Sequence, residues 1–330
     1  MTTFFSIGVT TYNRRDLLME ALSSIRGQTF HDYEVIIGND YTEERLSGHL
    51  LGVTDERVRF VNHPRNLGEM RNMNFLLAES RGRYFTWLAD DDVYAPTFLE
   101  AVHATLVKFG YLPCVFTSYM AATTFPERLE MPMREGECFE GRQFLQLYLN
   151  RTLKTQGCYG VFDAQYQRKM GGMEQLGGGF SPYSDQLLVI KAGRLRTIAY
   201  IDAPLIFYRT HEQSVSLAST DLDAYKSAQE SLCSKSIKVF SSEGLREDFQ
   251  LNLFLLLRWC IRDFATVLHR SGSVDRRRII AYLLFIRRYF RLLRGSSLYW
   301  RAIGFLSKVG CRLVWDIGRR KYGRQFRLVA

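Results

Sequence analysis

The sequence lacks the features that mark exported, membrane-spanning and zinc-binding chains. No basic segment with a long apolar stretch opens it, and residues 4–9 are typical of a first strand, so we expect no signal peptide. The longest apolar runs, Leu251–Leu257 and Ala281–Ile286, fall far short of the roughly 20 residues that a membrane-spanning helix needs. The six cysteines lie far apart, which disfavours a structural zinc site and fits reduced thiols in a cytosol.

The net positive charge of the chain is concentrated at its end. Residues 271–330 contain 15 Lys and Arg against two Asp, a local net charge of +13 that leaves −3 of the total of +10 for residues 1–270. With 46% hydrophobic residues, the 330-residue chain can bury a full core and carry a further helical region. The basicity therefore belongs to the tail.

Short β-rich runs alternate with helical periodicity in the first part, which predicts an α/β fold with a mostly parallel sheet flanked by helices. Between residues 123 and 217 the pattern is irregular and glycine-rich around a helical piece that starts near Tyr183, and we expect inserted loops over the carboxyl edge of the sheet. From residue 221 onward the pattern is helical. We therefore predict two domains, residues 1–220 and 221–330. The predicted strands are 5–10, 34–37, 59–61, 84–88 and 114–118, and the predicted late helices are 251–268, 274–293 and 298–317.

Three adjacent carboxylates, Asp90, Asp91 and Asp92, directly follow an apolar strand. Because neighbouring like charges repel and burial is costly, this pattern favours a divalent ion as partner. Carboxylate oxygens suit Mg²⁺ or Mn²⁺, which usually take one or two protein carboxylates together with substrate phosphates. A helix-capping cluster before Pro96 is the alternative.

A second acidic residue, Asp40, follows the predicted strand at 34–37. The carboxyl ends of parallel strands face one crevice, so Asp40 and the aspartate cluster can serve one ligand. By itself, Asn39-Asp40 also fits an ordinary turn.

Four blocks of residues, in this order, resemble family 2 glycosyltransferases with the GT-A (Rossmann-like) fold. Together they span residues 5–216, which makes the ordered set specific. The blocks are Thr10-Thr11-Tyr12-Asn13-Arg14 with residues 24–30; Asn39-Asp40-Tyr41-Thr42; Asn66-Leu67-Gly68 and Arg71-Asn72 leading to the aspartates; and Tyr183-Ser184-Asp185 with residues 208–216.

The resemblance implies a role for each matched residue. Where the family motif usually has a leading aspartate this chain has Ala89, which leaves open which carboxylate does what. From the residues alone, His211 also fits a structural histidine, Asp185 a helix cap, and Arg71 a solvated helix residue. The implied general base is Asp185; nucleotide-sugar binding falls on Thr10, Tyr12, Asn13, Arg14, Asp40, Asn66, Arg71 and Asp90; the Mg²⁺ or Mn²⁺ site falls on Asp91, Asp92 and His211.

The resemblance implies an inverting, metal-dependent glycosyltransferase. It would move a sugar from a nucleotide sugar, most commonly a UDP-sugar, to a glycan or lipid-linked acceptor in bacterial surface polysaccharide synthesis. A base and a Lewis acid suffice for direct displacement. A sugar nucleotidyltransferase and a catalytically silent sugar-binding or scaffold protein are the alternatives, and the first is disfavoured because no glycine-rich basic loop lies near the amino terminus.

The basic tail combines clustered arginines with bulky apolar and aromatic residues, over 276–291, 298–315 and 319–321. Helices of this kind can lie in an interface, with cationic residues drawn to anionic lipid. We therefore expect a cytoplasmic protein attached peripherally to the inner face of the cell membrane. A core-covering or dimerising helical element, giving a homo-oligomer, is the alternative. No nucleic-acid partner is expected, because no reading motif accompanies the charge.

Overall fold

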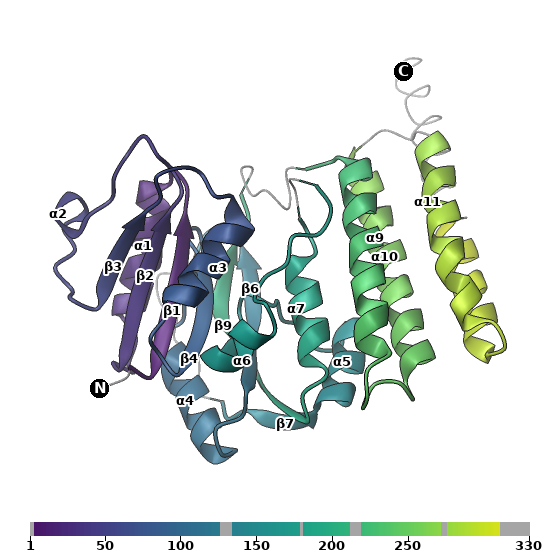
Figure 1. Cartoon of the computed structure of the whole chain (residues 1–330), viewed down its shortest axis with the longest axis horizontal. Coiled ribbons are helices and arrows are strands. Elements are labelled where there is room, and N and C mark those ends of the chain that lie inside the picture. The colour runs from purple at the N-terminus through teal and green to yellow at the C-terminus, as the bar shows by residue number, and fades with distance from the viewer. Residues whose placement is uncertain (1–2, 126–133, 179–180, 212–218, 272–275, 311–330) are drawn as a thin grey trace, which may run out of the picture. The chain divides into compact units, whose positions relative to one another are not determined.

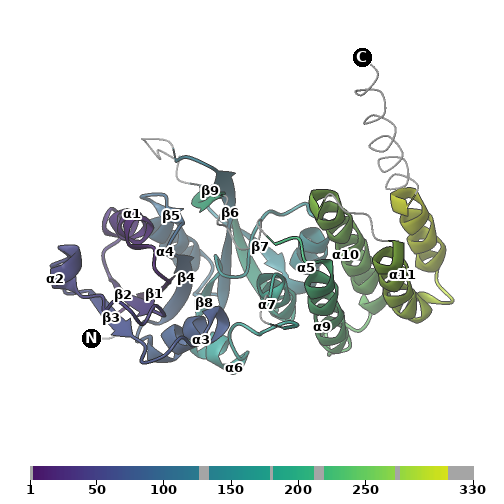
Figure 2. The ribbon, with the colours of Figure 1, turned by 90° about the horizontal axis from the view of Figure 1, so that it is seen from above.

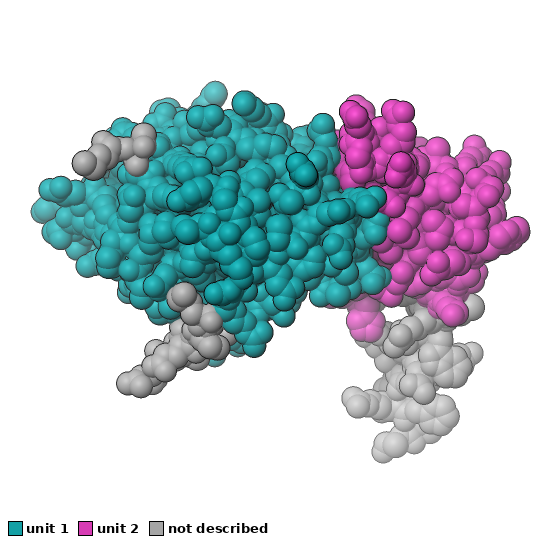
Figure 3. All heavy atoms as spheres, turned by 90° about the horizontal axis from the view of Figure 1, so that it is seen from below, with its two compact units in different colours: residues 1–175, 184–217 teal, residues 176–183, 218–330 magenta. Residues whose placement is uncertain are grey.

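The computed structural model describes residues 3–125, 134–178, 181–211, 219–271 and 276–310. The chain divides into two units (Figure 3): unit 1 is Met1–Gln175 with Ser184–Leu217, and unit 2 is Leu176–Tyr183 with Ala218–Ala330. The sequence-based division at residue 220 put residues 176–183 in the first domain, whereas here they cluster with the second unit.

Unit 1 is built on one sheet, which has nine strands within the described residues, in the order β3-β2-β1-β4-β8-β6-β9-β5 with β7 paired to β9. The long pairings β1–β2, β1–β4, β2–β3 and β6–β9 are parallel. The predicted α/β fold with a mostly parallel sheet is confirmed. The strands are β1 Phe5–Thr11, β2 Tyr33–Asn39, β3 Val58–Asn62, β4 Tyr84–Ala89, β5 Val93–Tyr94, β6 Cys114–Ala122, β7 Glu137–Glu140, β8 Val161–Asp163 and β9 Thr197–Arg209.

Helices cover both faces of this sheet, with α1 and α4 on one face and α3 and α6 on the other (Figure 2). An apolar stripe on α1, which includes Leu18, Leu22 and Ile25, is buried in the same core as Leu99 and Val102 of α4. Burying such stripes is what holds short helices in place. The helices of unit 1 are α1 Arg15–Arg26, α2 Gly48–Leu51, α3 Glu69–Glu79, α4 Phe98–Lys108, α5 Gly141–Leu149, α6 Ala164–Lys169 and α7 Ser184–Ala192.

The strand β9 shows that the expectation of loops between residues 123 and 217 was wrong. It runs parallel to β6, from the pair Val115↔Ala199 to the pair Ala122↔Arg209, with register shifts on either side of Ser118. Pro204 carries no backbone N–H and Asp202 is exposed, so the segment lacks the continuous pattern that indicates a central strand. Because β9 ends at Arg209, it brings His211 close to the edge where β4 ends.

Unit 2 is helical (Figure 1), as its periodicity predicts: α9 Leu222–Phe240, α10 Phe249–Ser271, α11 Arg276–Phe290, a 3₁₀ turn Arg291–Leu293, and a helix over 297–310. The Asp221 side chain caps α9 by accepting from the backbone N–H groups of Asp223 and Ala224. In the described part of the chain, every helix is too short or too polar to cross a bilayer. The rest of the basic tail, residues 311–330, lies outside the described residues.

A buried polar network joins the elements of unit 2. The Gln229 amide donates to the Tyr183 hydroxyl at 2.9 Å and accepts from the Tyr282 hydroxyl at 2.8 Å. Tyr183 in turn donates to Asp263 at 2.5 Å. Because each of these buried polar groups has a partner, the network fixes one arrangement of α9, α10 and α11 and the segment that contains Tyr183.

Candidate active site

Three parallel strands end side by side at one edge of the sheet in unit 1. Thr11 at the end of β1 pairs with Asn39 of β2, and Thr10 pairs with Ala89 of β4. Beyond the strands, the Asp40 backbone N–H donates to the Thr11 carbonyl at 3.0 Å. The segments that carry Arg14, Asp40 and the aspartate cluster therefore leave the sheet next to each other, as the parallel arrangement requires.

The first aspartate, Asp90, is almost fully buried against the end of β1. Its Oδ2 accepts from the Thr11 hydroxyl at 2.7 Å and from the Tyr12 N–H at 3.4 Å, and its Oδ1 lies 3.4 Å from Arg14 Nη1. Burial raises the pKa of Asp90 to about 6, although the Thr11 hydrogen bond and the Arg14 charge oppose the shift. Asp90 thus ties the predicted nucleotide-binding segment to the aspartate cluster.

The second aspartate, Asp91, faces two cationic or potentially cationic side chains. Its Oδ2 accepts from Arg14 Nη1 at 2.9 Å and lies 3.0 Å from Nε2 of His211. Asp91 is partly buried, with 13% of its side chain exposed. Asp91 and His211, which are 120 positions apart in the sequence, are thereby in contact, and this is the convergence that the predicted metal site requires.

The third aspartate, Asp92, has 1% exposure and both oxygens engaged. Oδ2 accepts from the Tyr159 hydroxyl at 2.6 Å, and Oδ1 accepts from the Arg209 backbone N–H at 2.9 Å. Burial and the charge of Asp91 raise the pKa of Asp92 well above its usual range. Asp92 therefore anchors β9 and the segment before β8, and of the three carboxylates Asp91 is better placed to meet a ligand.

Asp40 holds the turn that begins α3. Its two oxygens accept from the backbone N–H groups of Leu67 at 2.7 Å and Gly68 at 2.8 Å. Gly68 also donates to Asn66 Oδ1 at 2.8 Å and has φ of 82°, a conformation that favours glycine. Since Asp40 is only 5% exposed, the arrangement makes it an anchor for the predicted nucleotide-binding segment.

Asp185, the predicted general base, lies in the first turn of α7 and is partly buried. Its Oδ1 accepts from the Cys158 backbone N–H at 2.5 Å. Burial raises the pKa of Asp185, while hydrogen bonds from the Cys158 backbone and thiol lower it. The carboxylate is thus held with one oxygen engaged.

Glu69, the first residue of α3, links Asp185 to the aspartate cluster electrostatically. Loss of solvation, followed by the negative charges of Asp185 and Asp91, raises the pKa of Glu69, even though the side chain keeps exposed surface. Repulsion between carboxylates is strong only over short distances in a protein. The adjacent residues Cys158 and Tyr159 bond to Asp185 and Asp92, so Asp185 and the aspartate cluster lie in one acidic region of unit 1.

In the part of the chain that the structure describes, the side chains of the remaining predicted residues make no hydrogen bond to the aspartates. Tyr12 is 52% exposed, and its ring meets that of Tyr41 edge-on at 5.4 Å. Asn13 has φ of 52°, which asparagine tolerates. Among the described residues, Thr10, Asn13 and Arg71 make no side-chain hydrogen bond to Asp90, Asp91 or Asp92. The predicted closing motif continues into 212–216, which lies outside the described residues.

Sequence reasoning missed five residues of this region. Each of them either donates a hydrogen bond to a predicted residue or interacts with one electrostatically. Thr11 and Arg209 stood inside the quoted blocks, and Glu69 directly followed one, so adjacency to a motif was the available signal. No pattern marked the other two. The five are Thr11, Glu69, Cys158, Tyr159 and Arg209.

Metal binding at this edge would depend on few protein ligands. Within the described ranges, no three His, Cys, Asp or Glu side chains form a ready-made ion site. Asp91 Oδ2 and His211 Nε2, 3.0 Å apart, are a donor pair that suits Mg²⁺ or Mn²⁺ when substrate phosphates supply further ligands. The residues present therefore fit a metal held jointly with a diphosphate.

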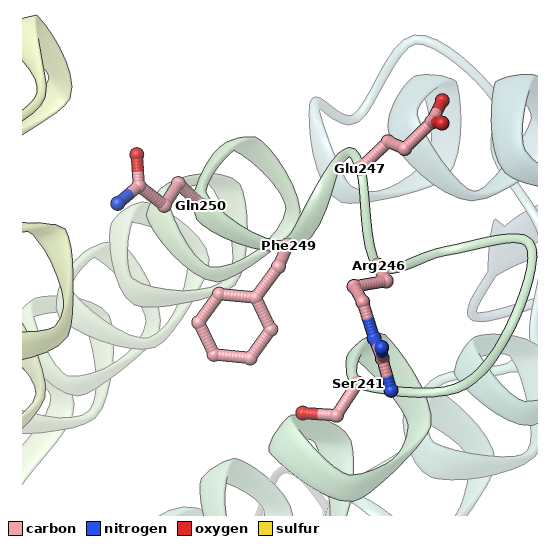
Figure 4. Close-up of a pocket in the computed structure, with 5 residues that line it drawn as sticks. All are labelled: Ser241, Arg246, Glu247, Phe249 and Gln250. Atoms are coloured by element: carbon pink, nitrogen blue, oxygen red, sulfur yellow. The ribbon is translucent and has the colours of Figure 1, made fainter.

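A separate open pocket of about 510 Å³ lies in unit 2, at the turn between α9 and α10 (Figure 4). It contains none of the residues that converge at the sheet edge of unit 1. Its lining residues are Ser241, Arg246, Glu247, Phe249 and Gln250.

The fold is that of GT-A glycosyltransferases. The chain is similar to the crystal structure of Staphylococcus aureus TarS 1–349 in complex with UDP-GlcNAc, with a TM-score of 0.65 over 97% of this chain and 92% of that chain. The identity is 14%, so this likeness shows the fold alone. Residues 6–167, just under half of the chain, match the model of glycosyl transferase family 2.

Curated relatives match between a quarter and a third of the chain. An uncharacterized glycosyltransferase of Haemophilus influenzae is 30% identical over 109 residues, which are 32% of this chain and 34% of that protein. The putative colanic acid biosynthesis glycosyl transferase WcaA of Escherichia coli is 32% identical over 99 residues (29% and 35%). The GalNAc(5)-diNAcBac-PP-undecaprenol beta-1,3-glucosyltransferase of Campylobacter jejuni is 34% identical over 90 residues (26% and 29%). The match spans about a third of each of these relatives.

Proposed function

We propose that this chain is an inverting glycosyltransferase that moves a sugar from a UDP-sugar or a similar nucleotide sugar to a hydroxyl of a glycan or lipid-linked acceptor. The observation that carries the proposal is the convergence of Asp91 and His211 on one contact, in the same acidic region as Asp185. The names of the Escherichia coli and Campylobacter jejuni relatives support a role in bacterial surface polysaccharide synthesis.

In this proposal the donor lies along the segments that follow β1 and β2. Tyr12 offers an exposed aromatic face for a base, and Arg14 offers a guanidinium for the diphosphate. Asp90 and Asp40 hold these segments in place through the contacts described above. The other residues assigned to binding of the nucleotide sugar are Thr10, Asn13, Asn66 and Arg71.

The reaction is a single displacement at the anomeric carbon. The acceptor oxygen forms a bond to that carbon, the bond to the phosphate oxygen breaks, and the carboxylate of Asp185 takes the acceptor proton. Arg14 stabilises the negative charge that develops on the departing nucleoside diphosphate. A divalent ion held by Asp91 and His211, with Asp92 behind them, would add positive charge at the same diphosphate. No covalent intermediate is needed.

A panel of nucleotide sugars tests the proposal directly. Release of nucleoside diphosphate is measured with Mg²⁺ or Mn²⁺ and again with EDTA, on the parent chain, Asp91→Ala and Asp185→Ala. We expect one donor to be turned over with the metal, and both variants to lose most of that activity. Full activity in both variants would refute the assigned roles, and donor binding without turnover in the parent chain would favour a silent sugar-binding protein.

The same proposal includes peripheral attachment to an anionic membrane surface, because a lipid-linked acceptor resides there. On α11 and the turn after it, Ile280, Leu284, Arg287 and Arg291 are exposed at spacings that place them on one side of a helix. Tyr282 and the other buried residues of α11 lie on the opposite side. An apolar stripe bordered by arginines fits a headgroup layer that carries negative charge.

Vesicle co-sedimentation tests this attachment. We expect the full chain to sediment with vesicles rich in phosphatidylglycerol and less with pure phosphatidylcholine. The double variant Ile280→Asp/Leu284→Asp should remain in the supernatant, whereas Val107→Asp, at an exposed apolar position of unit 1, should behave like the parent chain. Equal sedimentation of the double variant would exclude this face. If the parent chain sediments with neither type of vesicle and forms dimers, the result would favour the dimerisation alternative.

A further inference from the structure

Four consecutive residues, Gly157–Gly160, contact both the proposed base Asp185 and the aspartate cluster. The Cys158 backbone N–H donates to Asp185 at 2.5 Å, and the hydroxyl of the next residue, Tyr159, donates to Asp92 at 2.6 Å. Adjacent residues of one short segment thus hold the proposed base and one member of the aspartate cluster. We name residues 157–160 the bridging turn.

The bridging turn is also fastened to the sheet. The Cys158 carbonyl accepts from the backbone N–H of Trp87 at 3.3 Å, in the strand β4 that leads directly into the aspartate cluster. The Gly160 N–H donates to the Gly157 carbonyl at 3.1 Å and closes the turn on itself. The position of the bridging turn is therefore coupled to that of β4, the strand that the three aspartates directly follow.

Close packing leaves the bridging turn little room to move. A Cβ atom on Gly157 would lie 2.4 Å from the carbonyl oxygen of Asp185, and one on Gly160 would lie 2.4 Å from the Phe162 ring. Contacts that short do not occur without displacement of a neighbour, and here one neighbour is backbone of α7. Tyr159 itself is only 1% exposed. Glycines are required at both ends because the backbone approaches α7 on one side and the sheet on the other.

We propose that the bridging turn is a positioning element that sets the spacing between the base Asp185 and the aspartate cluster, with Cys158 orienting Asp185 and Tyr159 orienting Asp92. This inference rests on the proposed function, because the turn can position a base only if Asp185 is that base. The turn itself takes no part in the chemical step. Displacement geometry is demanding: an error of about 1 Å in the placement of a reacting group can cost on the order of 100-fold in rate. A rigid link between the two ends would prevent such errors.

The turn also affects the protonation of the base. The N–H and the thiol of Cys158 both stabilise the ionised form of Asp185 and so lower its pKa, against the opposing effect of burial. Since the backbone N–H cannot be removed by substitution, the thiol is the part that a variant can test. Serine at position 158 keeps a donor, whereas alanine does not.

Steady-state kinetics and pH profiles of single variants test the proposal. The informative variants are Tyr159→Phe, Cys158→Ala and Cys158→Ser. The matched controls are Tyr84→Phe, which removes a buried hydroxyl bonded to the Leu112 carbonyl near the opposite end of β4, and Cys114→Ala, which removes a buried thiol of β6. Thermal unfolding is measured for all five, so that a loss of fold is recognised.

We expect kcat of Tyr159→Phe to fall at least tenfold with little change in KM for the donor, while Tyr84→Phe keeps the parent kcat. The acidic limb of kcat against pH should move to higher pH in Cys158→Ala, because the ionised base loses a donor, and should return in Cys158→Ser. A merely structural role would lower stability without moving that limb. If Tyr159→Phe does not fold, the Cys158 pair still decides the question.

Two failures are distinguishable. If Asp185→Ala abolishes turnover while Tyr159→Phe and Cys158→Ala match their controls in kcat and pH profile, the positioning role is overturned and the proposed function stands. If Asp185→Ala is as active as the parent chain, the proposed function itself fails.

Discussion

Replacing Asp91 with asparagine should separate catalysis from stability. The amide keeps the size of the side chain and an oxygen that can accept from Arg14 Nη1, now at 2.9 Å, but it removes the negative charge. That charge is the one best placed to hold a divalent ion with His211, at a contact of 3.0 Å. The variant therefore tests the negative charge of Asp91 without leaving a cavity in the site.

The expected effect on rate is large. Removing one group that stabilises charge in a transition state typically lowers kcat by about 10²–10³-fold, or roughly 3–4 kcal/mol. We expect Asp91→Asn to fall in that range and to respond weakly to added Mg²⁺ or Mn²⁺. The assay is nucleoside diphosphate release across a metal titration.

The expected effect on stability is small because two contributions oppose each other. The hydrogen bond from Arg14 is weakened because its acceptor loses its charge, and the cost is bounded by the roughly 1.5–3 kcal/mol that a hydrogen bond to a charged group contributes. Removing the charge also relieves its repulsion with the buried carboxyls of Asp90 and Asp92, both of whose pKa values it raises. We expect the free energy of unfolding to change by no more than about 2 kcal/mol, since the two terms are of similar size.

The matched control is Asp202→Asn, which neutralises an exposed carboxylate on β9 of the same unit and should leave both properties unchanged. The reasoning is refuted if Asp91→Asn retains half of the parent kcat, or if it loses activity only because it unfolds at the assay temperature.

Two further predictions concern the stability of unit 1. The pKa of Asp90 is raised above its unfolded value of 3.8 to about 6, so the folded state binds more protons between these values. The contribution of Asp90 to stability is therefore fully present below pH 3.8 and is lost as pH rises through about 6; it amounts to roughly 3 kcal/mol from a shift of about two units. Denaturant titrations of the metal-free protein should show this slope, and Asp90→Asn should flatten it; an unchanged slope would contradict the assignment. Gly68→Ala should cost about 1–3 kcal/mol, because φ of 82° strains any other residue. Chemical denaturation measures this. The comparison is Gly178→Ala, at a glycine that has open space around its Cβ position and no positive φ.

The fold and the centre of the site were accessible from sequence because their signals are local. Asp40 and Asp90 each follow an apolar run directly, and the carboxyl ends of parallel strands must meet at one edge. The register of β1 with β2 and β4 then determines that these residues are neighbours. No knowledge of distant contacts was needed for this step.

The supporting contacts were not accessible because they join residues that are distant in sequence through single side chains. Tyr159 lies 67 positions from Asp92, and Arg209 lies 117 positions from it. A buried hydrogen bond across such a separation leaves no periodic pattern. β9 was missed for another reason: Pro204 and Asp202 interrupt the alternation that marks a strand, while its pairing with β6 supplies the stabilisation that local preference lacks.

The pairing of Arg14 with Asp91 has a consequence for the order in which ligands arrive. A guanidinium already occupies the oxygen that a divalent ion would use, so in the free protein the two cations compete for it. A diphosphate gives the guanidinium another anion to bind and brings ligand oxygens of its own, so nucleotide and metal should each tighten the binding of the other by the same factor. Titrating Mn²⁺ with and without UDP measures that factor, and equal affinities in the two titrations would show that Arg14 does not act as an exchangeable counter-ion.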